Sequence, residues 1–463
     1  MSESTSRHVR PYENVLGTVG WTPLIRLHRV TRGIRTPVYG KAEFMNPGGS
    51  VKDRIGHAII DAAEKAGDLK PGGTIVEGTS GNTGVALALA ASIKGYRCIF
   101  TIPDKMSQEK IRLLKAFGAE VIVTPTAVPP DHPDDYVMTA RRITRETPNA
   151  VLANQFYNQA NPEAHYATTG PEIWRQTDGR VTHFVASAGT GGTISGTGKY
   201  LKEQNPDIRV VAGDPEGSAL AHYWATGEKS EGQPYKVEGI GNEKIPETLW
   251  FDVVDRYESV SDRDAFHMAR RLTREEGLFV GGSAGLIVHL AVEVAREVDD
   301  PEALVVAILC DTGERYLSKV FNDEWMRENR LIEPERLDAG QLLAHKDQGT
   351  PDLVVVTRQQ TVREALALLT AHDVSQLPVL EDGRNAGAVS EDTLMARVLE
   401  DPAILDEPVA GLMGEPYPEV EAQTSLEEVA RLLTRQTPAA IVRQDGACTG
   451  IITRYDLVRQ LTG

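Results

Sequence analysis

The amino-acid sequence predicts an α/β fold with two mainly parallel sheets, followed by a tandem pair of smaller α+β repeats. Between residues 37 and 310, short β-rich runs alternate with segments of helical spacing. The β-rich runs are continuously apolar, as parallel strands covered on both faces tend to be. After residue 345, two segments of similar pattern follow one another, which indicates a duplicated module.

Six runs in the first part are predicted to be buried parallel strands. They are "TIVEG" (74–78), "CIFTIP" (98–103), "EVIVTP" (120–125), "THFVAS" (182–187), "RVVAGD" (209–214) and "ALVVAIL" (303–309). Helical spacing is found between them in "NTGVALALAASIKG" and "SQEKIRLLKAFGA". Alternation of strands and helices is typical of the α/β class.

The two repeats begin at Thr361 and Ser425. Each contains a helical segment, a short strand, a glycine-containing turn, a second strand and a second helical segment, in that order. We therefore predict a catalytic domain over residues 1–340 and repeats over 345–400 and 405–463.

Composition excludes several classes of function. The formal net charge is −17, which argues against nucleic acid or an anionic membrane as the main partner. The three cysteines, Cys98, Cys310 and Cys448, form no CxxC pair, so we expect neither a disulfide framework nor a metal site. No stretch approaches the roughly 20 apolar residues of a membrane span, and the first residues lack a signal-peptide core. We expect a cytoplasmic protein.

The segment "NPGGSVKDR" (46–54) places a lysine, Lys52, directly after a tight turn. Two glycines and a proline make this turn rigid and let the backbone approach a ligand closely. A solvated lysine on a turn is the ordinary alternative. A nucleophilic lysine, by contrast, has to be held still, and the motifs that follow favour that interpretation.

The segment "TSGNTG", Thr79 to Gly84, lies between the strand "TIVEG" and a helix. Small hydroxyl and amide side chains stand there beside the free backbone N–H groups of a helix N-terminus. Such a place suits an anion, here a carboxylate. A plain N-cap turn needs fewer polar residues than this segment supplies.

A glycine-rich segment, "SAGTGGTISG" (187–196), again lies between a strand and a helix. It has no Gly-Lys-Ser/Thr ending, as a P-loop would. Ile194 replaces the last glycine of a dinucleotide-binding fingerprint. Asp214 at the end of the next strand nevertheless keeps a dinucleotide site open as an alternative. A single phosphate fits best. Its expected ligands are Gly189, Thr190, Gly191, Gly192 and Thr193.

A fourth motif, "GGSAG" (281–285), precedes another apolar helix. Alone it is weak, since many such strings are only tight turns. Together the four motifs supply a reactive amine, a carboxylate site, a phosphate site and a small hydroxyl. Pyridoxal 5′-phosphate (PLP), which carries one phosphate and an aldehyde that lysine captures as a Schiff base, would use all of them.

From residue 10 to about 330, the four motifs and their order resemble the fold-type II PLP enzymes, in the cysteine synthase/cystathionine β-synthase family. The resemblance implies that Lys52 is catalytic and carries PLP, that Asn82 bonds its ring hydroxyl, and that Ser283 faces its pyridine nitrogen. It also implies phosphate binding by Gly189 to Thr193. The implied substrate-binding residues are Thr79, Ser80, Asn82, Thr83, Gln155, Glu238 and Gly239.

Within this family two activities stay open. The first condenses L-serine with L-homocysteine to L-cystathionine, with hydrogen sulfide production as a further activity left open. "VEGIGNEKIP" (237–246) and the fused repeats, which resemble tandem CBS regulatory modules, favour it. The second uses O-acetylserine or O-phosphoserine with sulfide, and Phe156 after Gln155 favours it. A non-catalytic nucleotide sensor is a third hypothesis, against which the intact motifs speak.

The repeats are expected to bind S-adenosylmethionine or an adenine nucleotide, unless they only support dimerisation. In ligand-binding copies a Thr or Ser and an Asp three residues later hold a ribose. "GIITRYDL" supplies Thr453 and Asp456, whereas the first repeat has Ser390 and Thr393. The animal members that the chain resembles have a heme segment with a Cys and a His ahead of the catalytic domain. Here His8 stands without any cysteine before Cys98, so no heme is expected. We expect a homo-oligomer, a dimer or higher.

Overall fold

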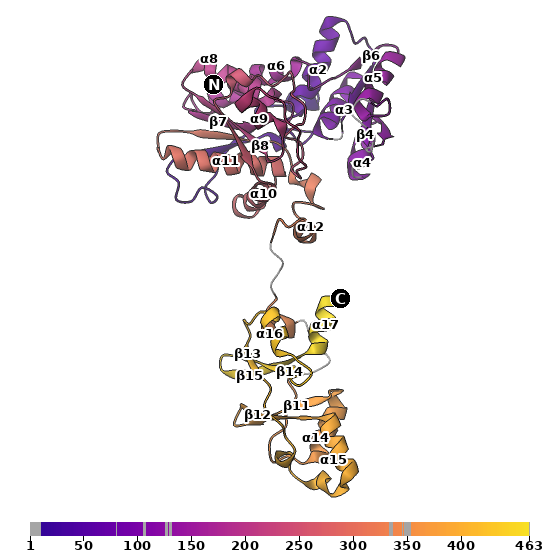
Figure 1. Cartoon of the computed structure of the whole chain (residues 1–463). Helices are drawn as coiled ribbons and strands as arrows, with labels where there is room; N and C mark the ends of the chain where they lie inside the picture. The colour runs from indigo at the N-terminus through magenta and orange to yellow at the C-terminus, as the bar shows by residue number, and fades with distance from the viewer. Residues whose placement is uncertain are drawn as a thin grey trace. The chain divides into compact units, whose positions relative to one another are not determined.

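The computed structural model describes residues 11–79, 81–104, 108–125, 128, 132–332, 337–344, 346 and 353–462. The chain forms two compact units, Met1–Glu333 and Pro334–Gly463 (Figure 1). No helix within the described residues is long and apolar enough to cross a membrane.

The larger sheet of the first unit has six strands, in the order β1-β2-β10-β7-β8-β9. All neighbouring pairs are parallel except β1 with β2. Every residue of the central β10 is buried, and α8 and α11 pack against the sheet. The bounds are β1 (Leu24–Arg26), β2 (Val38–Ala42), β7 (His183–Ser187), β8 (Arg209–Pro215), β9 (Arg256–Val260), β10 (Val305–Leu309), α8 (Gly192–Gln204) and α11 (Gly282–Val298).

The smaller sheet has four parallel strands, in the order β5-β4-β3-β6. Its strands are β3 (Thr74–Gly78), β4 (Arg97–Pro103), β5 (Glu120–Thr124) and β6 (Ala150–Leu152), and its helices are α2 (Asp53–Ala66), α3 (Asn82–Lys94), α4 (Gln108–Ala116) and α5 (Tyr136–Glu146). The other helices of the first unit are α6 (Ala160–Ala167), α7 (Thr169–Gln176), α9 (Ala219–Thr226), α10 (Asp262–Glu276) and α12 (Asp323–Glu328).

The predicted α/β class with two mainly parallel sheets is confirmed, and all six predicted strands are present. The prediction that every one of them is buried is wrong for β5. This strand is the edge of the smaller sheet, so Glu120 is exposed and Val123 is 51 % exposed. The sequence interpretation missed β1, β2, β6 and β9, which have three to five residues each.

The four sequence motifs all lie where a strand or turn leads into a helix. Lys52 is the N-cap residue of α2, and Asn82 is the first residue of α3 after β3. The glycine-rich segment joins β7 to α8, and Ser283 is the second residue of α11. Since the carboxyl ends of parallel strands open toward ligands in α/β folds, this arrangement brings both sheets to one site.

The second unit contains the two predicted repeats. The first consists of α14 (Val362–His372), β11 (Gln376–Glu381), β12 (Arg384–Ser390) and α15 (Glu391–Glu400). The second consists of α16 (Leu426–Leu432), β14 (Ala439–Gln444), β15 (Ala447–Thr453) and α17 (Arg454–Thr462), with β13 (Glu419–Glu421) parallel to β14. Both hairpins turn on an Asp-Gly pair with positive φ, the geometry that suits a tight hairpin.

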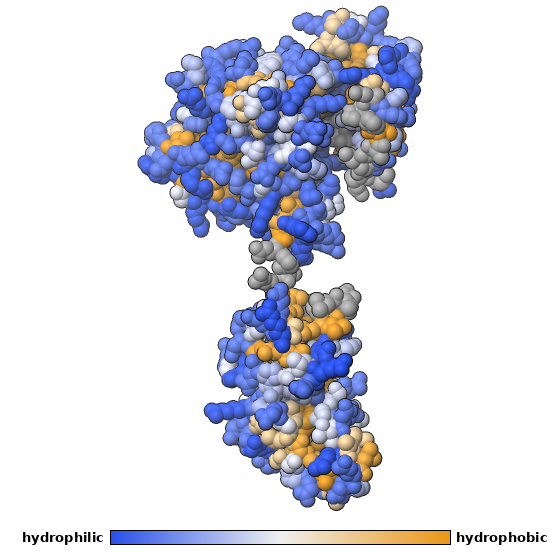
Figure 2. Space-filling model, in the orientation of Figure 1, coloured by the Kyte–Doolittle hydropathy of each residue, from blue (hydrophilic) through white to orange (hydrophobic). Residues whose placement is uncertain are grey.

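A short helix, α13 (Ala339–Ala344), packs in the core of the second repeat through buried Ala339 and Leu342. The first compact unit ends at Glu333, before the expected boundary at residue 340. Figure 2 shows apolar side chains at the surface of the second unit. The exposed ones include Met395, Leu399, Tyr455 and Val458, on α15 and α17.

Candidate active site

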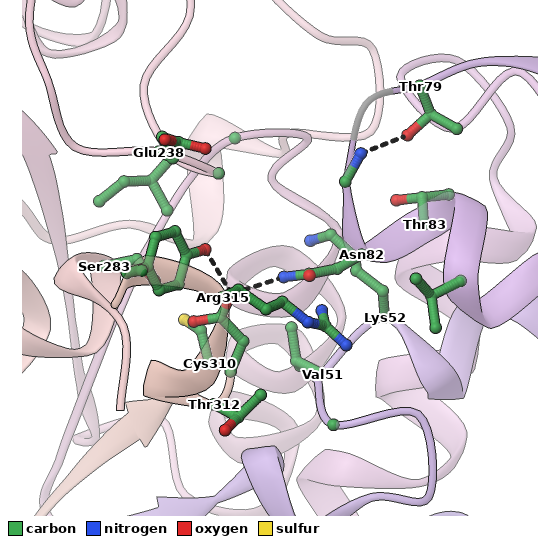
Figure 3. Close-up of a pocket in the computed structure, with 18 of the residues that line it drawn as sticks. Val51, Lys52, Thr79, Asn82, Thr83, Glu238, Ser283, Cys310, Thr312 and Arg315 are labelled. Atoms are coloured by element: carbon green, nitrogen blue, oxygen red, sulfur yellow. Dashed lines mark hydrogen bonds between the residues drawn. The ribbon is translucent and has the colours of Figure 1, made fainter. Parts of the chain in front are cut away.

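A cavity of about 1180 Å³ lies in the first unit, and residues of both sheets line it (Figure 3). The predicted site residues that line it are Lys52, Thr79, Asn82, Thr83, Gln155, Gly189, Thr190, Gly191, Thr193, Glu238, Gly239 and Ser283. Gly192 is not among its lining residues. Ser80 lies outside the described residues.

Lys52 reaches into this cavity from the start of α2 (Figure 3). Its amine makes no hydrogen bond or ion pair with any other described residue, and its backbone N–H donates to the Ser50 hydroxyl at 3.2 Å. Burial lowers the pKa of Lys52, although the charge of Asp311 opposes the shift. A larger share of the amine is therefore uncharged and nucleophilic near neutral pH.

The turn before Lys52 is held from two sides at Gly48. The Gly48 N–H donates to the Asp53 carboxylate at 2.5 Å, and the Arg315 guanidinium donates to the Gly48 carbonyl. A Cβ at Gly48 would lie 2.5 Å from the Asp53 carboxylate, so only glycine fits. Burial raises the pKa of Asp53 to about 7. Arg315 was not predicted as a site residue.

Four buried charges fix the beginning of α2. Arg54 donates to Glu43 at 2.7 Å and to both carboxylate oxygens of Glu172 at 2.8 and 2.7 Å, and the Lys41 amine bonds Glu172 at 2.7 Å. Burial opposes the ionisation of Glu172, but the two cations lower its pKa to about 2. Removing one member of such a cluster costs about 3–5 kcal/mol, because it leaves an unpaired buried charge.

Asn82 is held by Asp311, which follows the end of β10 in the other sheet. Its side-chain N–H donates to the Asp311 carboxylate at 2.7 Å, and the Tyr316 hydroxyl donates to the same carboxylate oxygen at 2.6 Å. The second Asp311 oxygen is buried and has no partner among the described residues. Burial raises the pKa of Asp311. Asp311 and Tyr316 were not recognised in the sequence as site residues.

Ser283 and Cys310 lie together on another wall of the cavity (Figure 3). Ser283 is 4 % exposed, and its hydroxyl is within hydrogen-bonding reach of the Cys310 sulfur. Burial raises the pKa of the Cys310 thiol to about 12, so the sulfur is a neutral thiol at neutral pH. The Ser283 hydroxyl and the Cys310 thiol are both neutral hydrogen-bonding groups.

The glycine-rich segment shapes the part of the cavity next to the N-terminus of α8. A Cβ at Gly189 would lie 2.6 Å from the Gly239 carbonyl, and Gly191 has φ +85°. The Thr190 and Thr193 hydroxyls line the cavity, and the nearby Ser187 hydroxyl is buried without a partner in the described residues. Hydroxyls and backbone N–H groups at a helix N-terminus suit a phosphate.

Gly192 has a packing role that the sequence interpretation did not foresee. A Cβ at Gly192 would lie 1.9 Å from the Asn161 side chain, and one at Gly196 would lie 1.9 Å from the Pro162 carbonyl. Both glycines therefore let α6 pack directly against α8. The side of Gly192 faces α6 and not the cavity, and its phosphate role stays a prediction.

The expected carboxylate site contains one strong internal bond. The Thr83 hydroxyl donates to the Gln155 side-chain oxygen at 2.6 Å, and the Gln155 amide also donates to the Glu77 carboxyl, so one amide N–H is left for a ligand. Thr79 is buried and accepts a 3.4 Å bond from the Gly81 N–H. Donors from α3 and from the segment after β6 thus meet at one place.

Glu238 lies between two lysines that the sequence interpretation did not single out. It forms an ion pair with Lys110, and Lys319 donates to it at 2.6 Å. Burial opposes its ionisation, but the two lysines hold the pKa of Glu238 below its usual value. All three residues line the cavity and provide charges of both signs.

A family model described as "Pyridoxal-phosphate dependent enzyme" matches residues 15–311. The chain belongs to this family. A second model, "CBS domain", matches residues 349–400 and 409–463. The predicted combination of a fold-type II PLP domain with tandem CBS domains is therefore confirmed.

Curated relatives extend this likeness over most of the chain. The chain is 37 % identical to "Cystathionine beta-synthase" of Dictyostelium discoideum, over 97 % of this chain and 92 % of that protein. It is 40 % identical to "Cystathionine beta-synthase" of Saccharomyces cerevisiae, over 86 % of this chain and 82 % of that protein. A solved cysteine synthase from Entamoeba histolytica matches with a TM-score of 0.64 and 36 % identity, over 71 % of this chain and 93 % of that chain.

The residues of the cavity fit PLP. A PLP-dependent enzyme needs a free amine, phosphate donors and a partner for the ring nitrogen. The structure offers the Lys52 amine without a bonded partner among the described residues, hydroxyls at Thr190 and Thr193, and the Ser283 hydroxyl. The dependence on PLP is thereby supported by both the family and the donor set.

Proposed function

We propose that the protein condenses L-serine with L-homocysteine to give L-cystathionine, as a PLP-dependent lyase. One observation carries the proposal: the buried Lys52 amine, with its lowered pKa, faces the cavity that Asn82, Gln155, Thr190 and Ser283 also line. The likeness to cystathionine β-synthases over nearly the whole chain supports the choice of reaction.

When bound, PLP supplies an aldehyde for an amine and an electron sink for the carbon next to it. Lys52 would hold the cofactor at rest. Once the serine amine has replaced it there, the Lys52 amine would act as general base and take the proton from Cα of serine. Overall, the C–O bond at Cβ would be broken, a C–S bond to homocysteine would form, the hydroxide and the thiol proton would leave as water, and Lys52 would return its proton to Cα.

The surrounding residues orient the serine. Gln155 donates its remaining amide N–H to the serine carboxylate, because Thr83 occupies its oxygen and Glu77 its other N–H. Thr79, Ser80 and Asn82 complete the proposed carboxylate site. Ser283 offers a neutral hydroxyl to the pyridine nitrogen, which makes the ring a weaker electron sink than a carboxylate partner would and so favours elimination over transamination.

The second substrate needs partners for an ammonium and a carboxylate. Glu238 presents a carboxylate to the cavity, and Lys110 and Lys319 present amines beside it. We propose that Glu238 receives the homocysteine ammonium and that the lysines receive its carboxylate. Sulfide carries neither group and would gain nothing from this set.

A cysteine synthase activity with O-acetylserine or O-phosphoserine is the second candidate. Phe156 lines the cavity, which favours this candidate. The likeness of the catalytic unit to the Entamoeba histolytica cysteine synthase also favours it. Comparing kcat/KM for homocysteine plus serine with kcat/KM for sulfide plus O-acetylserine decides between the two. We expect the first to be larger, and a reversed ratio would assign the protein to cysteine synthesis.

Lys52→Ala tests the cofactor site itself. We expect it to abolish both β-replacement and the visible absorbance of the lysine-bound cofactor, because no other lysine lies in the turn before α2. The far-ultraviolet circular dichroism should stay unchanged. Retained absorbance in the variant would overturn the assignment.

We further propose that the second CBS repeat binds S-adenosylmethionine or an adenine nucleotide at Thr453 and Asp456. The hydroxyl and carboxylate lie side by side, since the Thr453 hydroxyl donates to Asp456 at 2.7 Å. In the first repeat Ser390 faces Thr393 at 2.8 Å, without a carboxylate. We propose that no heme is required.

For the assembly, we propose a homodimer or higher oligomer located in the cytoplasm. Exposed apolar side chains on α15 and on α17, among them Leu399 and Tyr455, are candidates for contact with a second copy. The three cysteines are free thiols, which suits a reducing compartment. The net charge of −17 speaks against nucleic acid as a partner.

A further inference from the structure

Helix α6 brings two polar side chains to the back of the glycine-rich segment. Asn161 and His165 are four residues apart, so they lie one above the other on one face of the helix. Asn161 contacts the Thr190 hydroxyl and His165 contacts the Thr193 hydroxyl, at 3.0 and 3.2 Å. Asn161 is 1 % exposed and His165 is fully buried.

The direction of the Asn161 bonds follows from its neighbours. The Asn161 amide nitrogen donates to the Gln155 carbonyl at 2.9 Å and to the Thr190 hydroxyl oxygen at 3.0 Å. A flipped amide would place its oxygen against the Gln155 carbonyl oxygen, which can only accept. Because Thr190 accepts here, its own hydroxyl proton is free for another acceptor.

His165 has a partner at each ring nitrogen. Nδ1 lies 2.8 Å from the Thr169 hydroxyl, and Nε2 lies 3.2 Å from the Thr193 hydroxyl. Burial, together with the positive charges of Arg54 and Lys52, lowers the pKa of His165 well below its usual value, so the ring is neutral. A neutral ring donates from one nitrogen and accepts at the other.

The two tautomers of His165 differ in what they leave to a ligand. If Nδ1 carries the proton, Nε2 accepts a hydrogen bond from the Thr193 hydroxyl. Only the lone pairs of the Thr193 oxygen are then left for a ligand. If Nε2 carries the proton, Thr169 donates to Nδ1, Nε2 donates to the Thr193 oxygen, and the Thr193 proton is free. A phosphate dianion accepts hydrogen bonds only, so it favours the second arrangement.

We propose that Asn161, His165 and Thr169 are positioning residues for the cofactor phosphate. Asn161 donates to Thr190, Thr169 donates to His165 and His165 donates to Thr193, so that both threonine hydroxyl protons point at the phosphate. The proposal rests on the proposed function insofar as Thr190 and Thr193 hold that phosphate. It also explains why α8 carries glycine at 192 and 196, since larger residues would push α6 away.

The decisive measurement is the ratio of the dissociation constants for pyridoxal and PLP, which differ only in the phosphate. His165→Leu removes the donor, and we expect it to weaken PLP binding by about tenfold or more while pyridoxal binding stays constant. His165→Gln keeps an amide donor near the Nε2 position and should recover part of the loss. A role in packing alone would change both ligands equally.

Thr169 offers a subtler variant with a matched control next to it. Thr169→Val removes the donor to Nδ1. We expect the dissociation constant for pyridoxal, divided by that for PLP, to fall by about threefold to tenfold. Thr169→Ser should preserve the ratio. Thr168→Val should also preserve it, because the Thr168 hydroxyl donates to the Ala164 carbonyl at 2.6 Å and takes no part in the chain of donors.

A second readout follows the tautomer directly. In the holoenzyme labelled with ¹⁵N-histidine, the resonance that His165→Gln removes should carry its proton on Nε2. A proton on Nδ1, or a ratio that stays at the wild-type value in folded Thr169→Val and His165→Leu, would overturn the proposal. If instead the wild type binds pyridoxal as tightly as PLP, the assignment of the phosphate site is wrong. The positioning role of Asn161, His165 and Thr169 is then wrong as well.

Discussion

The amide of Asn82 and the carboxylate of Asp311 are joined by a 2.7 Å hydrogen bond across the cavity, from the first turn of α3 to the residue after Cys310 (Figure 3). Because Asp311 only accepts when ionised, the bond fixes which end of the Asn82 amide is the nitrogen. Tyr316 donates to the same carboxylate and fixes it in turn. The bond thereby fixes the orientation of Asn82, which we propose binds the cofactor ring hydroxyl.

Asp311→Ala should lower kcat/KM for serine by about tenfold to hundredfold, since a hydrogen bond to a charged group contributes about 1.5–3 kcal/mol. Tyr316→Phe leaves the Asn82 bond in place and should cost less. Steady-state kinetics and cofactor occupancy of both variants give the comparison. Equal kcat/KM for Asp311→Ala and wild type would show that Asn82 needs no such support.

The sequence alone located the cofactor motifs because each is local. A strand end, a few small residues and a helix start are visible within ten residues, as in Thr79 to Gly84. Asp311 could not be found in this way, since its partner Asn82 is 229 positions away. The same holds for Lys110 and Lys319, which reach Glu238 from distant segments.

Two other differences also have physical reasons. The continuously apolar run of β5 predicted a buried strand. Such a run does not show whether the strand has a neighbour on both sides, and β5 has one on one side only. The packing role of Gly192 was not predicted, because a glycine-rich segment looks the same whether a ligand or another helix approaches it. Only the position of α6 distinguishes the two.

Glu238→Gln should raise KM for homocysteine by about tenfold and leave KM for serine unchanged, because the amide has no charge for the homocysteine ammonium. Glu243→Gln in the same loop is a matched control, since Glu243 is exposed and does not line the cavity. Initial rates over a matrix of both substrate concentrations separate the two constants. A rise in KM for serine alone would move Glu238 to the other subsite.

Glu77 predicts a pH dependence of stability. Burial raises its pKa to about 7, although the Asn154 and Gln155 N–H groups donate to it. Between its unfolded value and about 7 the folded state binds the extra proton, so the free energy of unfolding falls as pH rises through this window. The contribution is up to about 3 kcal/mol. Urea unfolding at pH 5, 6, 7 and 8 measures the free energy of unfolding, which should decline less with pH in Glu77→Gln than in wild type. An identical decline in both would contradict this assignment.

A chain that ends at Glu333 should retain PLP and β-replacement activity. All cavity residues precede it, Leu331 is buried in the core, and His267 bonds the Leu331 carbonyl at 2.9 Å. A chain that ends at Asn322 lacks α12 and should be unstable. A soluble, PLP-loaded protein of 333 residues without activity would show that the repeats take part in catalysis.

The proposed adenosyl site in the second repeat is already occupied by internal bonds. The Asp456 carboxylate accepts from the Thr453 N–H and hydroxyl, both at 2.7 Å, and from the Lys346 amine at 3.0 Å. Lys346 also donates to the Ile451 carbonyl at 2.6 Å. A ribose that bonds Asp456 therefore has to share the carboxylate with Lys346 or displace it.

Lys346 consequently bears on which adenosyl ligand binds. Its positive charge disfavours the cationic S-adenosylmethionine and favours a nucleotide phosphate. Lys346→Met should therefore strengthen S-adenosylmethionine binding and weaken ATP binding. Asp456→Ala should weaken both by about tenfold to hundredfold, because the ribose loses a charge-assisted hydrogen bond.

Thr393→Asp places the missing carboxylate in the first repeat and should add a second site. Calorimetric titration of each ligand into wild type and the three variants measures these changes. Wild type that binds neither ligand would make the repeats structural, and Asp456→Ala that binds as tightly as wild type would place the site elsewhere.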